Sequence, residues 1–246
     1  MGSIDDLLVH MDTIEGRIPP GDPRRLFHAT YARTTRAVRD EIHAGGFADG
    51  MWVERWDVTF AGMYLGAFEA WDSGGHPPAP WQVAFDATTG PHLPPLRHVL
   101  LGMNAHINLD LPQALVAVIT DEEFDDPDAV AGRAADHHHI DDILAARVAA
   151  EDDELKRQEL PGDRTWKDRL LAPFLHQSTR RFLKEAREKV WNNARRLSEA
   201  RRSGPDALAG AVARLEELSR QRVADLTRPG DVIFELARNG FGVALD

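Results

Sequence analysis

Apolar residues recur along most of the chain with the period of an α-helix. From Trp52 to Trp71 the large apolar side chains follow one another at intervals of three or four residues, the spacing of one helix face. No segment alternates apolar and polar residues over a convincing length, as a half-buried strand would. The sequence therefore predicts an all-α protein, a single-domain bundle of about seven to nine helices. The expected helices cover a short piece around residues 4–11 and then about 24–44, 51–71, 81–87, 96–120, 129–157, 165–202, 205–227 and 230–238.

Glycine and proline divide these helices from one another. Residues 72–95 are rich in both, which predicts a long loop around the short helical piece at 81–87. Pro112 should kink or split the helix in which it lies, near Leu111, because proline cannot donate the backbone hydrogen bond of a helix interior. The acidic run at 121–128 is expected to be a loop.

The length and composition are those of a folded globular protein. A chain of 246 residues is long enough for one large domain with a real core. Hydrophobic residues make up 43% and charged residues 28%, which excludes disorder for most of the chain. We expect one domain over residues 1–246, made of an N-terminal arm and short helix (1–23), the helices that bear the candidate site (24–157) and C-terminal helices (158–246).

The charge balance and the absence of cysteine narrow the chemistry. Asp and Glu number 40 against 29 Lys and Arg, which argues against nucleic acid as the main partner. Without cysteine there are no disulfides, thiolate nucleophiles or Cys-based metal centres. No apolar run approaches the ~20 residues of a spanning helix, and residues 1–20 lack a signal-peptide core. We therefore expect a cytoplasmic protein without a membrane span that acts on a small-molecule substrate; its oligomeric state is left open.

Two His-x-x-x-Asp pairs are the main candidate for chemistry. Residues four apart lie on one face of a helix, about 5–6 Å apart at Cβ, so each pair can close on a single cation. Imidazole and carboxylate suit zinc, iron or manganese. The sequence predicts a divalent metal centre, most favourably zinc, whose ligands are His106, Asp110, His138 and Asp142.

Three further polar residues are candidate catalytic groups. Asp57 lies in the aromatic stripe between Trp56 and Phe60, where an acid needs a partner, and would bridge metals or act as general base. Asn104 and Asn108 would orient the metal ligands. The alternative is that these Asn, His and Asp side chains only form a buried hydrogen-bond network that fixes helix packing. Whether the site would receive His138 or its neighbour His137 is left open.

Two resemblances accompany these residues. The segment GMNAHINLDL at 102–111 resembles the signature of an uncharacterised bacterial family, a domain of unknown function, which implies no activity. More weakly, an early acid followed by two His-x-x-x-Asp pairs is similar to the zinc-dependent phospholipase C and P1 nuclease superfamily. That resemblance implies an all-α fold, Asp57 as bridging acid and both pairs as zinc ligands for phosphoester hydrolysis. The chain departs from that superfamily at its N-terminus, where Met-Gly-Ser stands in place of a metal-binding tryptophan.

Three functions follow as hypotheses. The first is a metal-dependent hydrolase that acts on a phosphoester or a similar small, partly hydrophobic substrate, with the metal converting bound water into hydroxide. The second is a helical enzyme of secondary metabolism, a cyclase or oxygenase, whose polar site lies in an apolar cavity and uses iron or metal-free acid–base groups. The third is a non-enzymatic helical binding protein with a structural Asn/His/Asp network.

Overall fold

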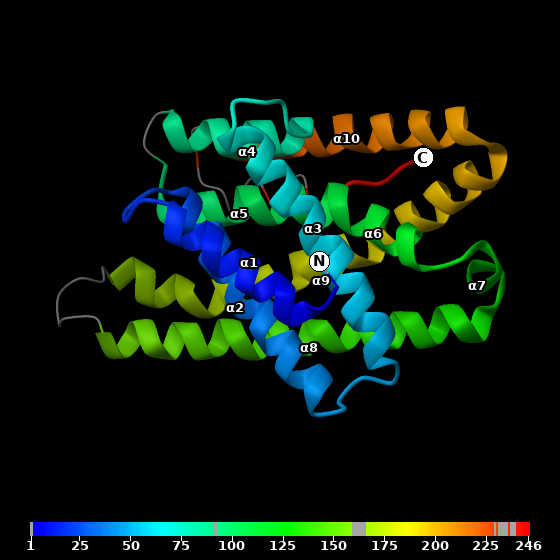
Figure 1. The fold of residues 1–246 in the computed structure, drawn as a ribbon. Coiled ribbons are helices and arrows are strands. Elements are labelled where there is room, and N and C mark those ends of the chain that lie inside the picture. Colours follow the sequence, from blue (N-terminus) through cyan, green and yellow to red (C-terminus); the bar gives the residue numbers. More distant parts are fainter. Residues whose placement is uncertain (1, 91–92, 159–165, 229, 231–235, 237–239) are drawn as a thin grey trace.

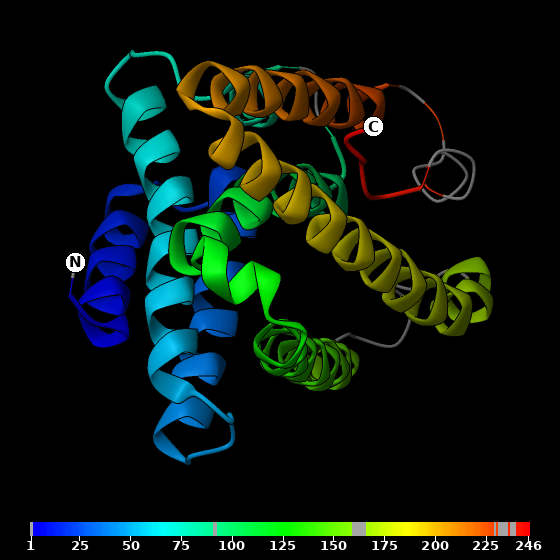
Figure 2. The same ribbon diagram turned by 90° about the vertical axis from the view of Figure 1, so that its right-hand side faces the viewer.

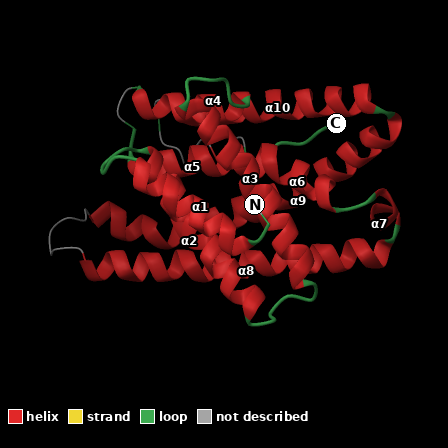
Figure 3. Cartoon of the chain, in the orientation of Figure 1, coloured by secondary structure: helices red, strands yellow, loops and turns green. Residues whose placement is uncertain are grey.

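The computed structural model describes residues 2–90, 93–158, 166–228, 230, 236 and 240–246, and the side chains of these residues apart from 141 and 144–184. This part of the chain contains helices and no strand (Figures 1 and 3). The helices are α1 (Ile4–Arg17), α2 (Arg24–His43), α3 (Gly50–Asp72), α4 (Ala79–Thr89), α5 (Pro95–Ala105), the π-helical turn η1 (His106–Asp110), α6 (Leu111–Val118), α7 (Asp121–Asp125), α8 (Pro127–Gln158), α9 (Trp166–Ser203) and α10 (Pro205–Thr227).

The all-α prediction is confirmed. Because α5, η1 and α6 follow one another without a break, they form one continuous rod, and the described residues then contain nine helical segments. The helix expected at 230–238 lies mostly outside the described residues. The described helices are all too short or too polar to span a lipid bilayer.

Helix α3 lies between α1 on one side and α6 on the other, and it also packs on α2 (Figure 2). Its stripe of large side chains is buried, and Asp49 caps its first turn by accepting a hydrogen bond from the backbone N–H of Trp52. Asp136 of α8 accepts two more, from the N–H groups of Ala48 and Asp49. A buried carboxylate at a helix N-terminus is favourable because it satisfies N–H groups and meets the positive end of the helix dipole.

The rod α5–η1–α6 passes the other helices at the centre of the molecule. Helix α5 packs on α2 and α10, α6 packs on α3 and α9, and the turn η1 between them touches α3, α9 and α10. Helix α10 lies along α4 at the opposite side from α8 (Figure 1). All five residues of η1 are buried, so any polar side chain on it must find its partners inside the protein.

The break expected near Leu111 takes the form of this wide turn. In η1 the N–H of Leu111 donates to the carbonyl of His106, five residues earlier. Pro112 has no N–H to offer the carbonyl of Asn108, and its ring needs room beside that carbonyl. A π-turn supplies that room by taking one extra residue, so the helix widens where a kink or a split was expected.

The prediction of a loop over 121–128 was wrong. Residues 121–125 form the short helix α7 because Thr120 and Glu123 make a capping box: the Thr120 hydroxyl accepts from the N–H of Glu123, and the Glu123 carboxylate accepts from the N–H of Thr120. The acidic residues of the first turn also lie at the positive end of the helix dipole.

We expect Gly102→Ala to destabilise the protein. A Cβ at residue 102 of α5 would lie 2.4 Å from Cγ of Phe27 in α2, so the ring would have to move within a packed core. Overpacking of this kind lowers the free energy of unfolding by about 1–3 kcal/mol.

The matched control is Gly66→Ala on the exposed side of α3, where no atom lies within 4 Å of the new Cβ. Alanine's better helix propensity should there raise the free energy of unfolding by up to ~1 kcal/mol. Urea titrations measure both variants, and a neutral Gly102→Ala would contradict the close approach of α5 and α2.

Candidate functional site

The pair His106 and Asp110 lies on η1 and is almost fully buried. The Nδ1 atom of His106 lies 2.8 Å from Oδ2 of Asp110. The same carboxylate oxygen accepts a hydrogen bond of 2.8 Å from the indole N–H of Trp81 in α4. Because a carboxylate oxygen accepts, we assign the imidazole proton to Nδ1, which leaves the lone pair on Nε2. Asp110 therefore fixes both the orientation and the tautomer of His106.

Aromatic rings hold the imidazole on both sides. The His106 ring stacks on Phe60 of α3, with ring centroids 3.6 Å apart and planes 3° apart. Tyr31 of α2 meets it edge-on at 4.6 Å. Beyond Phe60, the rings of Trp56 and Trp52 continue the stack along α3, and the guanidinium of Arg133 lies over Trp52 at 4.8 Å. The imidazole is thus one end of a packed aromatic column.

Several buried polar atoms in this region have no hydrogen-bond partner among the described residues. They belong to α2, α3, η1 and α8 and are linked through ring contacts or electrostatics to His106, Tyr31 or Trp56. Buried polar atoms are normally paired, so these atoms are ones that a water or a bound molecule could satisfy. We call this group the polar cluster; its atoms are Tyr31 Oη, Thr35 Oγ1, Trp56 Nε1, Asp57 Oδ2, His106 Nε2 and His137 Nε2.

His137 supplies a donor to this polar cluster. Its Nδ1 accepts a hydrogen bond of 3.3 Å from the indole N–H of Trp191 in α9, so we assign its proton to Nε2. Its ring lies 5.2 Å from that of Trp56, whose own N–H is likewise buried without an acceptor. Burial lowers the pKa of His137 well below its ordinary value, and the nearby positive charge of Arg187 adds to this, so the ring is neutral.

Burial also shifts the ionisation of Asp57, of Tyr31 and of the His106–Asp110 pair. It raises the pKa of Asp57 from the ordinary 3.8 to about 7. It lowers the pKa of His106, although the hydrogen bond and charge of Asp110 oppose the change. The pKa of Asp110 is raised by burial and held back by His106 and Trp81. Burial and the charges of Asp57 and Asp110 raise the pKa of Tyr31, whose hydroxyl stays protonated.

The two His-x-x-x-Asp pairs have different environments. His106 and Asp110 are buried, whereas His138 and Asp142 lie on the exposed side of α8. Of the two neighbouring histidines, His137 is the one that is buried and faces inward. Among the residues that the structure describes, no three His, Asp or Glu side chains are grouped so that they could share a metal ion.

Asn104 and Asn108 contact backbone rather than the imidazole pair. Their side-chain N–H groups both donate to the carbonyl of Phe241, at 2.9 Å and 3.0 Å. Asn108 Oδ1 also accepts from the N–H of Val243 at 3.0 Å. For these two residues the geometry is that of the alternative hypothesis, a buried network that fixes packing.

Sequence reasoning missed four members of the site: Tyr31, Thr35, Trp81 and His137 as donor. Tyr31 and Thr35 have the i, i+4 spacing of one helix face, which was a usable signal. Trp81 had no such signal in the sequence, because it contacts Asp110 from a different helix.

Comparison with known proteins gives the family of the chain but no activity. A model described as "Family of unknown function (DUF5995)" matches residues 4–229, and the chain belongs to that family. No curated protein and no solved structure matches it. The chemistry must therefore be argued from the site itself.

We expect Asp57→Asn to stabilise the protein, and to do so more at pH 8 than at pH 4. The folded state holds a proton on Asp57 up to about pH 7, whereas the unfolded chain releases it near 3.8. Stability contributed by this group is therefore present below pH ~4 and lost as pH rises to about 7. The asparagine variant lacks this loss of stability, which is about 4 kcal/mol for a shift from 3.8 to about 7.

Urea unfolding of wild type and variant at several pH values measures this difference. The exposed Glu122→Gln serves as control and should show no such trend. A difference that is constant with pH would contradict the buried, protonated state of Asp57.

Proposed function

We propose that this protein is an enzyme that transfers protons on a small, largely apolar molecule bound at the polar cluster. The observation that supports the proposal most is the buried His106, held by Asp110 and with an Nε2 lone pair that no described residue uses. A general base needs a lone pair that no other group uses and an orienting partner that stabilises the imidazolium. This is the metal-free form of the helical enzyme with a polar site in an apolar cavity.

Asp110 would act through His106 as a positioning residue. When Nε2 takes a proton from the substrate, the imidazolium gains a charge-assisted hydrogen bond to the carboxylate. The Trp81 N–H on the same oxygen keeps that carboxylate in place during the transfer. Stacking on Phe60 stops the ring from turning, so the lone pair keeps one direction.

Asp57 would be the second proton carrier. A pKa near 7 lets a carboxyl group exist in both forms at neutral pH, so it can donate the proton that completes the reaction. Two carboxyl groups in different environments thus take different roles: Asp110 is engaged by two donors, whereas Asp57 Oδ2 has none.

The arrangement of donors and acceptors favours a substrate that carries an oxygen acceptor. Trp56 and His137 offer N–H groups that have no acceptor among the described residues, which suit a carbonyl or similar oxygen where negative charge develops. The walls are aromatic, so the rest of the molecule should be apolar or cyclic. Abstraction and return of a proton beside a carbonyl, as in isomerisation or cyclisation, is the reaction class that uses all these groups.

A metal-dependent hydrolase is the second candidate. It is favoured by the same pair, because a histidine whose Nδ1 is held by a carboxylate is also a typical metal ligand. The donor atoms left for a metal would be His106 Nε2 and Asp57 Oδ2. A two-pair centre like that of the zinc phosphoesterases is less favoured, since Asp110 Oδ2 is engaged and His138 and Asp142 are exposed.

We expect His106→Gln and Asp110→Asn to abolish proton transfer, and His138→Gln to leave it intact. The assay is deuterium incorporation from D2O into a panel of small apolar ketones, lactones and esters, followed by NMR. Loss of a general base costs about 10²–10⁴ in rate, and the asparagine variant would present the wrong tautomer.

Two further measurements decide between the candidates. The ¹⁵N shifts of His106 should show a protonated Nδ1 and an unprotonated Nε2; the reverse would contradict a base at Nε2. Elemental analysis of wild type, His106→Ala and His138→Ala addresses the metal. Stoichiometric metal lost in His106→Ala would replace the proposal with a metal centre, which includes the second pair only if His138→Ala loses the metal as well. Loss of stability alone in His106→Ala would favour a non-enzymatic network.

A further inference from the structure

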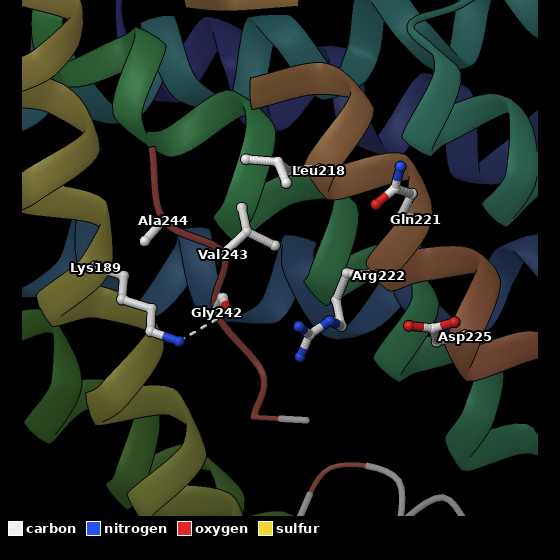
Figure 4. Close-up of a pocket in the computed structure, with 8 residues that line it drawn as sticks. All are labelled: Lys189, Leu218, Gln221, Arg222, Asp225, Gly242, Val243 and Ala244. Carbon is white, nitrogen blue, oxygen red and sulfur yellow. Dashed lines mark hydrogen bonds between the residues drawn. The ribbon is translucent and has the colours of Figure 1, made fainter. Parts of the chain in front are cut away.

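Residues 241–245 form a non-helical segment, here called the strap, that lies beside η1 between α9 and α10. Figure 4 shows its middle, Gly242 to Ala244, between Lys189 of α9 and Leu218 and Arg222 of α10. These residues together line a pocket at the edge of the strap. Phe241 and Val243 are buried, whereas Ala244 is exposed.

Side chains rather than backbone satisfy the strap's peptide groups. Asn108 and Asn193 each bind it twice: Asn108 bridges residues 241 and 243, and Asn193 accepts from Leu245 N at 2.8 Å and donates to Val243 O at 3.0 Å. Between them, Lys189 donates to Gly242 O at 3.1 Å. Helices α5, η1 and α9 are thereby tied together through one extended stretch of chain.

Gly242 lets the strap approach α9 closely. A Cβ at this position would lie 2.7 Å from Cα of Ala186 and 2.9 Å from Cδ of Lys189. The first of these atoms is backbone and cannot move aside, so any larger residue would lift the strap away from the helix.

The strap holds one face of η1 while the imidazole pair occupies the other. His106 and Asp110 are each two positions from Asn108, about half a helical turn, which places them roughly opposite the Asn108 amide that binds the strap. The turn is wider than an α-helix, a rare form that persists only where its surroundings maintain it.

We propose that the strap positions the His106–Asp110 pair by holding the π-turn in its wide form. Phe241, Gly242 and Val243 are then positioning residues for the base, an inference that rests on the proposed function. With the strap displaced, the amides of Asn104 and Asn108 lose their buried partners, and the turn is free to change register. A change of one residue rotates α5 against α6 by about 100° and moves the imidazole off Phe60.

The test uses the full chain with Gly242→Ala, and Gly210→Ala on α10 as control, since no atom lies within 4 Å of a Cβ at residue 210. Two quantities are measured: amide hydrogen exchange at residues 241, 243 and 245, and the ¹⁵N and ¹H signals and pKa of the His106 imidazole. We expect exchange at least tenfold faster and shifted His106 signals in Gly242→Ala only. Lys189→Ala removes the hydrogen bond to Gly242 O from a partly exposed position. It should change strap exchange and the His106 signals in the same direction as Gly242→Ala, but by a smaller amount.

Two results would overturn the proposal. If the strap amides exchange faster while the His106 signals stay unchanged, the strap ties helices together but positions nothing. If Gly242→Ala leaves strap exchange unchanged, the close approach is not what holds it. Either result leaves the general-base proposal standing, whereas a protonated Nε2 in wild type would remove that proposal without affecting the measured coupling.

Discussion

One carboxylate oxygen organises the centre of this protein. Oδ2 of Asp110 accepts hydrogen bonds from an indole on α4 and from the imidazole of His106 on the same turn. Burial would keep a carboxyl group with fewer hydrogen-bond donors in its protonated, neutral form. A buried imidazole without an orienting partner would be free to rotate about its side-chain bonds. The widened turn and the aromatic column along α3 can be understood as the frame that keeps these three groups in contact.

The fold was predictable from the sequence to a much greater extent than the site. The spacing from Trp52 to Trp71 identifies α3 because it depends on residues close in sequence, and Pro112 located the irregular turn. The His106–Asp110 contact was also local. By contrast, His137 and His138 differ by about 100° around α8, and only the packing of α8 on the bundle decides which faces inward. The roles of Trp81 and of the strap depend on contacts between distant segments, which periodicity does not encode.

The polar cluster lowers the free energy of unfolding of the protein, because its polar atoms are buried without partners among the described residues. Among the described residues, buried Asp57 has no partner for Oδ2, and several polar atoms of the cluster have none either. Selection for stability alone would replace such groups with apolar ones. Six of them are linked by ring contacts or electrostatics to an oriented imidazole or to one another, which is why we interpret these six as groups that meet a ligand.

The strap also sets an order of events during synthesis. Asn108 binds Val243, and 135 positions separate the two along the chain. A ribosome adding about 5–20 residues per second delivers the strap several seconds or more after the turn that it holds. Until then the side-chain amides of Asn104 and Asn108 lack their hydrogen-bond partners in the strap. The helices of the N-terminal half can therefore assemble before the contacts that hold η1 are complete.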